Sequence, residues 1–186
     1  MVRMSPELLI RVADPDRDAA AIASIYRPAV ESTIASFEEI APGPEQMAER
    51  IAATLPQLPW LVADDGADGA IGYAYAGPHR ERAGYRWSVN VSVYVGAGHQ
   101  RRGVGRALYD ELIPILRSQR FVNAYAGIAL PNDASVALHE AIGMRRVALY
   151  ERVGFKFGAW HDVAWYWLRL GEPSVPPPEP VPLSKL

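Results

Sequence analysis

The stretch "VSVYVGAGHQRRGVGRALY", residues 91–109, constrains the fold more than any other part of the sequence. Its first half is a run of β-branched and aromatic residues, which is typical of a buried strand. Its second half passes through glycines and arginines into an apolar stripe with helical spacing (Val104, Leu108, Leu112, Leu116). The first amide N–H groups of such a helix have no partner within the helix. The pattern therefore predicts a strand, a glycine-rich loop and a helix in direct succession.

Spacing alone leaves two interpretations of this junction open. In the first, the free amides and the helix dipole hold an anion such as a pyrophosphate, and Arg101, Arg102 and Arg106 add positive charge. In the second, the segment is a glycine turn with a solvated basic face. A dinucleotide fingerprint is not favoured, because Leu108 stands where the third glycine is needed and the next strand, "FVNAYAGIAL", carries no acidic residue. A Walker motif fails because no Lys-Ser/Thr pair follows the glycines.

Periodicity elsewhere predicts the element order βαα-βββ-α-β-α-ββ, an α/β sandwich rather than a doubly wound fold. Asp14-Pro15 starts a helix that is expected to stop before Pro28, and Pro44 opens a second helix. Pro114 is expected to kink or shorten the helix over 103–119. The expected strands are 8–13, 59–64, 70–77, 85–95, 121–130, 145–153 and 161–170, with a hairpin turn at 65–69, a short helix within 131–143 and a long loop before the last strand.

Length and composition exclude several classes of protein. A chain of 186 residues fits one domain, 1–170, followed by a Pro-rich tail, 171–186, that is extended and either loose or laid on the surface. The net charge of −2 gives no bulk attraction to nucleic acid or to a membrane. The sequence has no membrane-length apolar run and no signal-peptide pattern, so we expect a cytoplasmic protein. With 0 cysteines and 4 scattered histidines, neither a metal site nor a cysteine nucleophile is expected.

Gln100-Arg-Arg-Gly-Val-Gly105 resembles the Q/R-x-x-G-x-G/A motif of the GNAT acyltransferase superfamily. The segments "SFEEI", "PWLVAD", "AYAGP", "YRWSVNVSVYV", "LPNDASVALHEAIG" and "VGFKFGAWHDV" follow, in order, the pattern of its phosphinothricin and methionine sulfoximine N-acetyltransferases. The resemblance covers nearly the whole chain. It implies a GNAT-type mixed, mostly antiparallel central sheet with helices on both faces, acetyl-CoA as co-substrate, no metal, a homodimer and a role in antibiotic or herbicide resistance.

The resemblance also implies which residues contact the co-substrate. The backbone of Val93, Tyr94 and Val95 would pair with the pantetheine arm. The pyrophosphate would lie on the segment Arg101, Arg102, Gly103, Val104, Gly105 and Arg106. Asn132 matches the asparagine of the family that contacts the cofactor, and Ser135 lies one helical turn further along the same stripe. A plain helix N-cap is the alternative interpretation of Asn132, and the two roles are compatible.

Two residues are candidates for proton transfer. Family members carry a glutamate as the base in a "TVExSVYV" pattern, and Asn90 occupies that position in "SVNVSVYV". An amide does not accept a proton at neutral pH, so Asn90 could only orient a water molecule or the amine. His139 stands where many family members carry the tyrosine that protonates the leaving thiolate. The alternative for His139 is a packed structural histidine.

The acceptor would be a small anionic amino-acid analogue, because arginines suit bidentate capture of a carboxylate or phosphinate. Basic residues of the "GPHRERAGYR" loop and its tyrosine contact the substrate in the family; Phe37 would wall the pocket, and a dimer partner could complete it. The corresponding candidates are Phe37, Arg80, Arg82, Tyr85, Lys156 and His161. Two alternatives stay open at this point. One is a GNAT enzyme for a different small amine or amino acid, and the other is a non-catalytic acyl-CoA binding protein that has lost its base.

Overall fold

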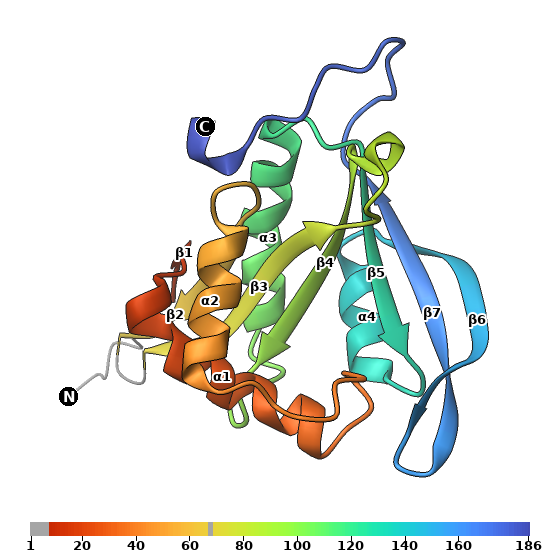
Figure 1. The fold of residues 1–186 in the computed structure, drawn as a ribbon. Helices are drawn as coiled ribbons and strands as arrows, with labels where there is room; N and C mark the ends of the chain where they lie inside the picture. The colour runs from red at the N-terminus through yellow and green to blue at the C-terminus, as the bar shows by residue number, and fades with distance from the viewer. Residues whose placement is uncertain (1–7, 67–68) are drawn as a thin grey trace.

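The structure is a computed structural model that describes residues 8–66 and 69–186. A seven-stranded sheet in the order β1-β2-β3-β4-β5-β7-β6 forms its centre (Figure 1). The strands are β1 (Leu9–Val12), β2 (Trp60–Asp64), β3 (Ala70–Pro78), β4 (Ser88–Val95), β5 (Asn123–Ala129), β6 (Arg145–Lys156) and β7 (Ala159–Arg169). All neighbouring strands are antiparallel except β4 and β5. The predicted element order and the mixed, mostly antiparallel sheet are confirmed.

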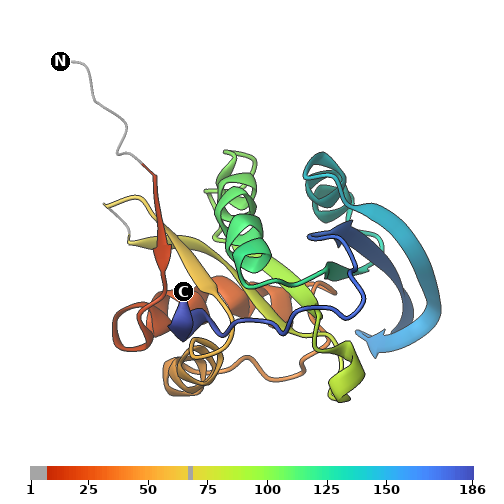
Figure 2. The same cartoon turned by 90° about the horizontal axis from the view of Figure 1, so that it is seen from above.

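Helices cover both faces of the sheet, as Figure 2 shows from above. On one face lie α1 (Pro15–Glu31) and α2 (Pro44–Thr54), and on the other lie α3 (Val104–Ser118) and α4 (Asp133–Ala141). Strand alternation divides β4 between two cores, because successive side chains point to opposite faces. Val91 belongs to the core under α3, whereas Tyr94 packs against the core under α1 and α2.

Helix α1 does not stop before Pro28 as expected, and α3 is not shortened at Pro114, whereas a kink there stays a prediction. Helix α1 continues through Pro28 to Glu31, and α3 continues through Pro114 to Ser118. A proline removes one helical hydrogen bond, but burial of the following turn offsets that loss. Val30 and Leu116 are 1% and 0% exposed, respectively. Tertiary packing therefore holds both helices beyond the positions where local propensity would end them.

The expected long loop before the last strand is also wrong. Strands β6 and β7 extend toward each other until only Phe157 and Gly158 separate them. Both residues have positive φ angles, 52° and 75°, which is the backbone of a two-residue type I′ hairpin. Phenylalanine at a positive φ is uncommon, so residue preference gave no sign of this turn. The predicted turn at 65–69 includes residues that lie outside the described part of the chain.

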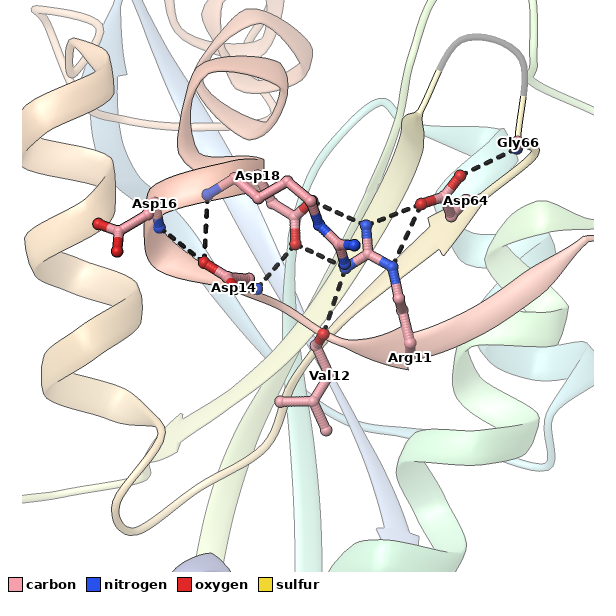
Figure 3. A network of polar contacts seen from close by, with 8 residues as sticks. Arg11, Val12, Asp14, Asp16, Asp18, Asp64 and Gly66 are labelled. Carbon is pink, nitrogen blue, oxygen red and sulfur yellow. Dashed lines mark hydrogen bonds and ion pairs between the residues drawn. The ribbon is translucent and has the colours of Figure 1, made fainter.

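Arg11 joins the first strand to the first helix and to the second strand (Figure 3). Its guanidinium donates to both carboxylate oxygens of Asp18, at 2.6 and 2.8 Å, and to Asp64 at 2.8 and 3.2 Å. Burial alone would raise the pKa of Asp18, but hydrogen bonds from Arg11 and from the Asp14 amide outweigh it, and the pKa is lowered. This ion network fixes the edge of the sheet against the start of α1.

The C-terminal tail lies across the surface, one of the two arrangements expected for it (Figure 1). The indole of Trp87 donates to Pro178 O at 2.7 Å, and Arg86 forms an ion pair with Glu179 at 2.6 Å. Further along, the buried Gln119 side chain donates to Val181 O at 2.9 Å. The tail thus connects the start of β4 to the end of α3.

Candidate functional site

Strands β4 and β5 pair over only three residues and then diverge (Figure 1). Their parallel register runs from Ser88↔Asn123 to Asn90↔Tyr125. Beyond Asn90, β4 stays paired with β3 up to Gly72↔Val95, so only its edge toward β5 is left without a strand partner. Backbone N–H and C=O groups along such an edge are available to a ligand that lies like an added strand. Of the residues predicted to hold an extended ligand, Val93 and Val95 direct their backbone groups to this edge, whereas those of Tyr94 face β3.

Helix α3 starts at the end of the divergent strand β4. Gly103 is its N-cap with φ 84°, a left-handed conformation that glycine adopts without steric cost. The first helical hydrogen bond of the helix runs from Ala107 N to Gly103 O, so the amides of Val104, Gly105 and Arg106 precede it. The preceding loop also contains Arg101 with φ 58°. This geometry matches the free helix terminus that the sequence predicted.

The three predicted arginines are not placed alike. Arg101 and Arg102 are exposed in the loop, and Arg102 lies 3.5 Å from the His99 ring. The guanidinium of Arg106 instead contacts Asp110 at 2.8 Å and Ala141 O, at the end of α4, at 2.8 Å. In this arrangement Arg106 offers its backbone amide to an anion, and its side chain joins α3 to α4.

Helices α3 and α4 approach closely at the same end of the site. A Cβ atom at Gly105 would lie 2.9 Å from the Leu138 side chain, which is closer than real contacts allow. Asn132 is the N-cap of α4 and accepts a hydrogen bond from Ser135 N at 3.1 Å. The cap interpretation of Asn132 is therefore confirmed, and its predicted contact with a cofactor stays a prediction.

His139 lies in the core, with 3% of its surface exposed. Its Nδ1 atom donates to Ser135 O at 2.7 Å, and its Nε2 atom lies 2.9 Å from the hydroxyl of Tyr109. Burial lowers the pKa of His139, although the bond to Ser135 O acts in the opposite direction. Both ring nitrogens are thus occupied in a neutral imidazole. This arrangement favours the structural interpretation, and a catalytic role for His139 stays an untested prediction.

Asn90 forms a hydrogen-bonded pair with His79, the residue that directly follows β3. Its Oδ1 atom lies 2.8 Å from Nδ1 of His79. The His79 ring stacks on Tyr125, with centroids 4.4 Å apart, and meets Tyr85 edge-on at 6.2 Å. His79 lies in the "GPHRERAGYR" loop, and the sequence indicated no role of its own for it. The β3–β4 register, in which Gly77 opposes Asn90, is the signal that could have found this pair.

The remaining predicted acceptor residues fall into two groups. Arg80, Arg82 and Tyr85 are exposed in the loop between β3 and β4. Phe37 lies against the β6–β7 hairpin, where its ring is 6.3 Å from that of His161 and a side chain at Gly154 would collide with it.

Lys156 is buried, and its ammonium group contacts backbone carbonyls of the same chain. The Nζ atom donates to Val30 O and to Ser36 O, each at 2.5 Å. Burial lowers the pKa of Lys156, and the charge of Glu38 partly counteracts this. Lys156 therefore ties α1 and the segment after it to the hairpin, and two of the three N–H groups of its ammonium are used inside the chain.

A cavity of about 630 Å³ lies between α2 and strands β2 and β3. It is lined by Tyr26, Met47, Arg50, Ala53, Thr54, Gln57, Leu58, Trp60, Tyr73, Tyr75, Ala76, Gly77 and Pro78. Gly77 and Pro78 immediately precede His79, so one end of the cavity reaches the region of the His79–Asn90 pair. Within the described part of the chain, its lining does not include Phe37 or Tyr85.

Comparison with known proteins decides the family. The family model described as "Acetyltransferase (GNAT) domain" matches residues 10–165. This chain belongs to the GNAT acetyltransferase family. As a GNAT protein it is 37% identical over 187 residues to a phosphinothricin N-acetyltransferase of Streptomyces viridochromogenes, covering 98% of this chain and 100% of the relative. The identity to an L-methionine sulfoximine/L-methionine sulfone acetyltransferase of Salmonella typhimurium is also 37%, covering 91% of this chain and 98% of the relative.

Solved GNAT structures share the arrangement of strands and helices described above. A GNAT superfamily phosphinothricin acetyltransferase from Sinorhizobium meliloti, solved in complex with acetyl-CoA, superposes with a TM-score of 0.86. It is 34% identical, and the match covers 96% of this chain and 94% of that chain. The protein is an acyl-transferring enzyme of the GNAT type. Among the described residues, no helix could span a membrane and no group of three or more His, Asp or Glu side chains could hold a metal ion.

Proposed function

We propose that the protein transfers an acetyl group from acetyl-CoA to the α-amino group of a small anionic amino-acid analogue of the phosphinothricin or methionine sulfoximine type. The observation that carries this proposal is similarity along almost the whole chain to enzymes with these two activities. A role in resistance follows from the same acceptors. The cytoplasmic location, the absence of a nucleic-acid partner and the division into domain 1–170 and tail 171–186 stay predictions from the sequence.

The residues at the start of α3 fit the diphosphate of acetyl-CoA. The amides of Val104, Gly105 and Arg106 precede the first helical hydrogen bond, and the helix dipole adds partial positive charge at the same point. Arg101 and Arg102 can add full charges from the loop. Because Arg106 is engaged with Asp110, its expected contribution is its backbone amide.

The divergent edge of β4 fits the pantetheine arm. Val93 and Val95 direct backbone groups to the side where β5 has departed, whereas Tyr94 stands in a hydrogen-bonded pair with Tyr73 of β3. An extended amide-bearing arm can pair there as a further strand does. The amide of Val95, which faces the open edge, is also a candidate to stabilise the negative charge that develops on the thioester carbonyl oxygen.

Direct transfer within a ternary complex is the mechanism that the composition supports. The chain has 0 cysteines, so it cannot form an acetyl-cysteine. Acetyl-CoA supplies an activated acyl group when bound, and the protein must align an uncharged amine with it.

For the acceptor, Arg80, Arg82 and Tyr85 are proposed to bind the acidic groups of the substrate, and Phe37 and His161 to wall the pocket. Arginine suits a carboxylate or a phosphinate because its fork of donors binds both oxygens. Tyr85 already lies 6.2 Å from the His79 ring. Lys156 is proposed to act indirectly, by holding the segment that presents Phe37.

We also propose a homodimer that uses the β6–β7 hairpin. Four large apolar side chains of this hairpin are exposed by 52–61%: Val153, Phe155, Phe157 and Trp160. Contiguous exposed apolar side chains of this kind are typical of association surfaces. Sedimentation at several concentrations tests the proposal, and a monomer at micromolar concentration contradicts it.

A thiol-release assay tests the function. The protein is incubated with acetyl-CoA and a panel of amines that includes phosphinothricin, methionine sulfoximine, methionine sulfone and the natural amino acids. We expect release of CoA with the first three compounds and much less release with the natural amino acids. If CoA is released only with a different amine, that amine would replace the proposed acceptor. Tight binding of acetyl-CoA without release for any amine would instead support a non-catalytic acyl-CoA binding protein.

A further inference from the structure

The pair formed by His79 and Asn90 stands where the reaction needs a proton acceptor. Asn90 is an amide, which does not accept a proton at neutral pH. Its Oδ1 atom lies 2.8 Å from Nδ1 of His79. The backbone supports this contact, because His79 N donates to Ser88 O at 3.3 Å and continues the β3–β4 pairing past the end of β3.

The hydrogen bond determines which nitrogen of His79 is basic. An amide oxygen only accepts hydrogen bonds, so Nδ1 of His79 carries the hydrogen and Nε2 keeps its lone pair. In catalytic triads, a third residue holds the basic histidine in the correct orientation and tautomer, and an asparagine can fill this role. Asn90 is therefore suited to hold the imidazole in the tautomer that can accept a proton at Nε2.

Aromatic rings from three elements fix the plane of the His79 ring. Tyr125 of β5 stacks on it at 4.4 Å with an interplanar angle of 23°. Trp165 of β7 meets it edge-on at 6.0 Å and 90°, and Tyr85 approaches from the turn before β4. The titratable groups in contact with the ring are thus the phenols of Tyr125 and Tyr85. The charged neighbours along the chain are Arg80 and Glu81.

The location of the ring matches the point of transfer. Tyr125 is the β5 partner of Asn90 in the last paired rung before β4 and β5 diverge. The His79 ring therefore lies at the point where β4 and β5 begin to diverge, next to the edge of β4 that is proposed to bind the pantetheine arm. The other histidine considered for proton transfer, His139, has both nitrogens occupied by Tyr109 and Ser135.

We propose that His79 is the general base of the acetyl transfer and that Asn90 is its positioning residue. This inference rests on the function proposed above. The ammonium group of the acceptor loses one proton to Nε2 of His79, directly or through one water molecule. The uncharged nitrogen then forms the C–N bond as the C–S bond breaks. The second proton lost by nitrogen reaches the CoA sulfur, and His79 releases the first to solvent.

Kinetics of a His79→Gln variant test the base. Positioned bases contribute about 10²–10⁴-fold, so we expect kcat to fall at least a hundredfold. The affinity for acetyl-CoA, measured by calorimetry, should stay the same. The pH profile of kcat/KM should differ between the unmodified protein and the variant, because the variant lacks the group that accepts the proton.

Two further variants separate the base from its support. The double variant His79→Gln/Asn90→Glu places a carboxylate where the pair now stands. Its kcat should be at least tenfold higher than that of His79→Gln. Asn90→Ala keeps the base but not its orientation, and losses of about 10–100-fold are typical when an orienting partner is removed. Glu81→Gln, in the same exposed loop, is the matched control and should keep the full rate.

The outcomes separate a failure of the base assignment from a failure of the proposed function. If the unmodified protein is active and His79→Gln keeps its rate and its pH profile, His79 is not the base, although the acetyltransferase remains. If the unmodified protein releases no CoA with any amine, both the proposed function and the base are wrong. Nitrogen-15 spectra that show hydrogen on Nε2 rather than Nδ1 of His79 in the free protein would also overturn the assignment.

Discussion

The hydroxyl of Tyr109 lies 2.9 Å from Nε2 of His139 beneath the site, and this contact uses the nitrogen that a catalytic acid would need. Tyr109 itself is fully buried, and burial raises its pKa. The phenol is therefore the donor, and the neutral imidazole is the acceptor. The contact joins α3 to α4 at the level of the opening between β4 and β5.

Removing this contact should lower stability. Tyr109→Phe leaves Nε2 of His139 buried without a partner, which costs about 1–3 kcal/mol in the free energy of unfolding. Urea denaturation measures the change. Turnover of the folded variant should stay within a few-fold of the unmodified protein. If His139→Gln folds normally and yet loses more than a hundredfold in kcat, the catalytic interpretation of His139 is correct instead.

The lowered pKa of His139 also predicts a pH dependence of stability. An unfolded histidine has a pKa of about 6.5 and binds a proton more readily than the buried ring does. The contribution of His139 to the free energy of unfolding is therefore fully present above about pH 6.5, and it is lost as pH falls toward the lower pKa of the folded state. Denaturation at pH 7.5 and 5.5 should show this loss in the unmodified protein and a smaller loss in His139→Gln.

Gly103 offers a test of the helix terminus with a matched control. Gly103 and Gly143 have φ angles of 84° and 90°, and an added Cβ would meet no close neighbour at either position. Alanine in this conformation costs about 1–2 kcal/mol, so both substitutions should lower stability by a similar amount. Only Gly103→Ala should weaken acetyl-CoA binding, by about tenfold in calorimetry, because Gly103 caps α3. Equal affinities in the two variants would contradict the proposed diphosphate site.

The ion network of Arg11 gives a prediction for stability alone. Asp18 is 2% exposed, and Arg11→Met would leave its carboxylate buried without its main partner. Such a loss typically costs about 3–5 kcal/mol in the free energy of unfolding. Arg27→Met, which removes an exposed pair with Glu31 within α1, should cost less than about 1 kcal/mol. Similar effects of the two substitutions in urea denaturation would show that the network adds nothing beyond a surface pair.

The sign of the pH dependence of this network follows from the lowered pKa of Asp18. The unfolded carboxyl group titrates near pH 3.9, so the stabilisation is fully present above that value. It is lost as pH falls through the lower pKa of the folded state. Acid unfolding followed by circular dichroism should begin at a higher pH in Asp18→Asn than in the unmodified protein.

The sequence could predict those parts of the fold that depend on local pattern. The run of β-branched and aromatic residues predicted β4, and the glycines after it predicted the free N-terminal end of α3. Contacts set by strand register could not be predicted in the same way. The approach of His79 to Asn90 depends on Gly77 opposing Asn90 across two strands. The direction of the Lys156 side chain likewise depends on carbonyl groups at Val30 and Ser36, more than a hundred residues earlier in the chain.

Lys156 should therefore behave as a structural residue. Lys156→Met leaves the carbonyl oxygens of Val30 and Ser36 buried without their donor, at a cost of about 1–3 kcal/mol each. The KM for the acceptor should rise, because Phe37 loses its support, whereas the affinity for acetyl-CoA should not change. Lys185→Met removes an exposed lysine of the tail and is the control. A rise in the acceptor KM without any loss of stability would instead indicate a direct contact between Lys156 and the substrate.

The Pro-rich tail should support the loop that carries Tyr85. Trp87 and Arg86 contact Pro178 and Glu179, directly after the turn that holds Tyr85. At the other end, removal of the tail leaves the buried amide of Gln119 without Val181 O as acceptor.

Truncation after Glu172 should therefore have two effects that separate measurements detect. The loss at Gln119 costs about 1–3 kcal/mol, which lowers Tm by about 2–12 °C for a chain of this size. The KM for the acceptor should rise more than the KM for acetyl-CoA, because the loosened loop is on the acceptor side. Glu179→Gln removes only the exposed ion pair and should leave Tm nearly unchanged. A truncated protein with the original acceptor KM would show that the loop holds its position without the tail.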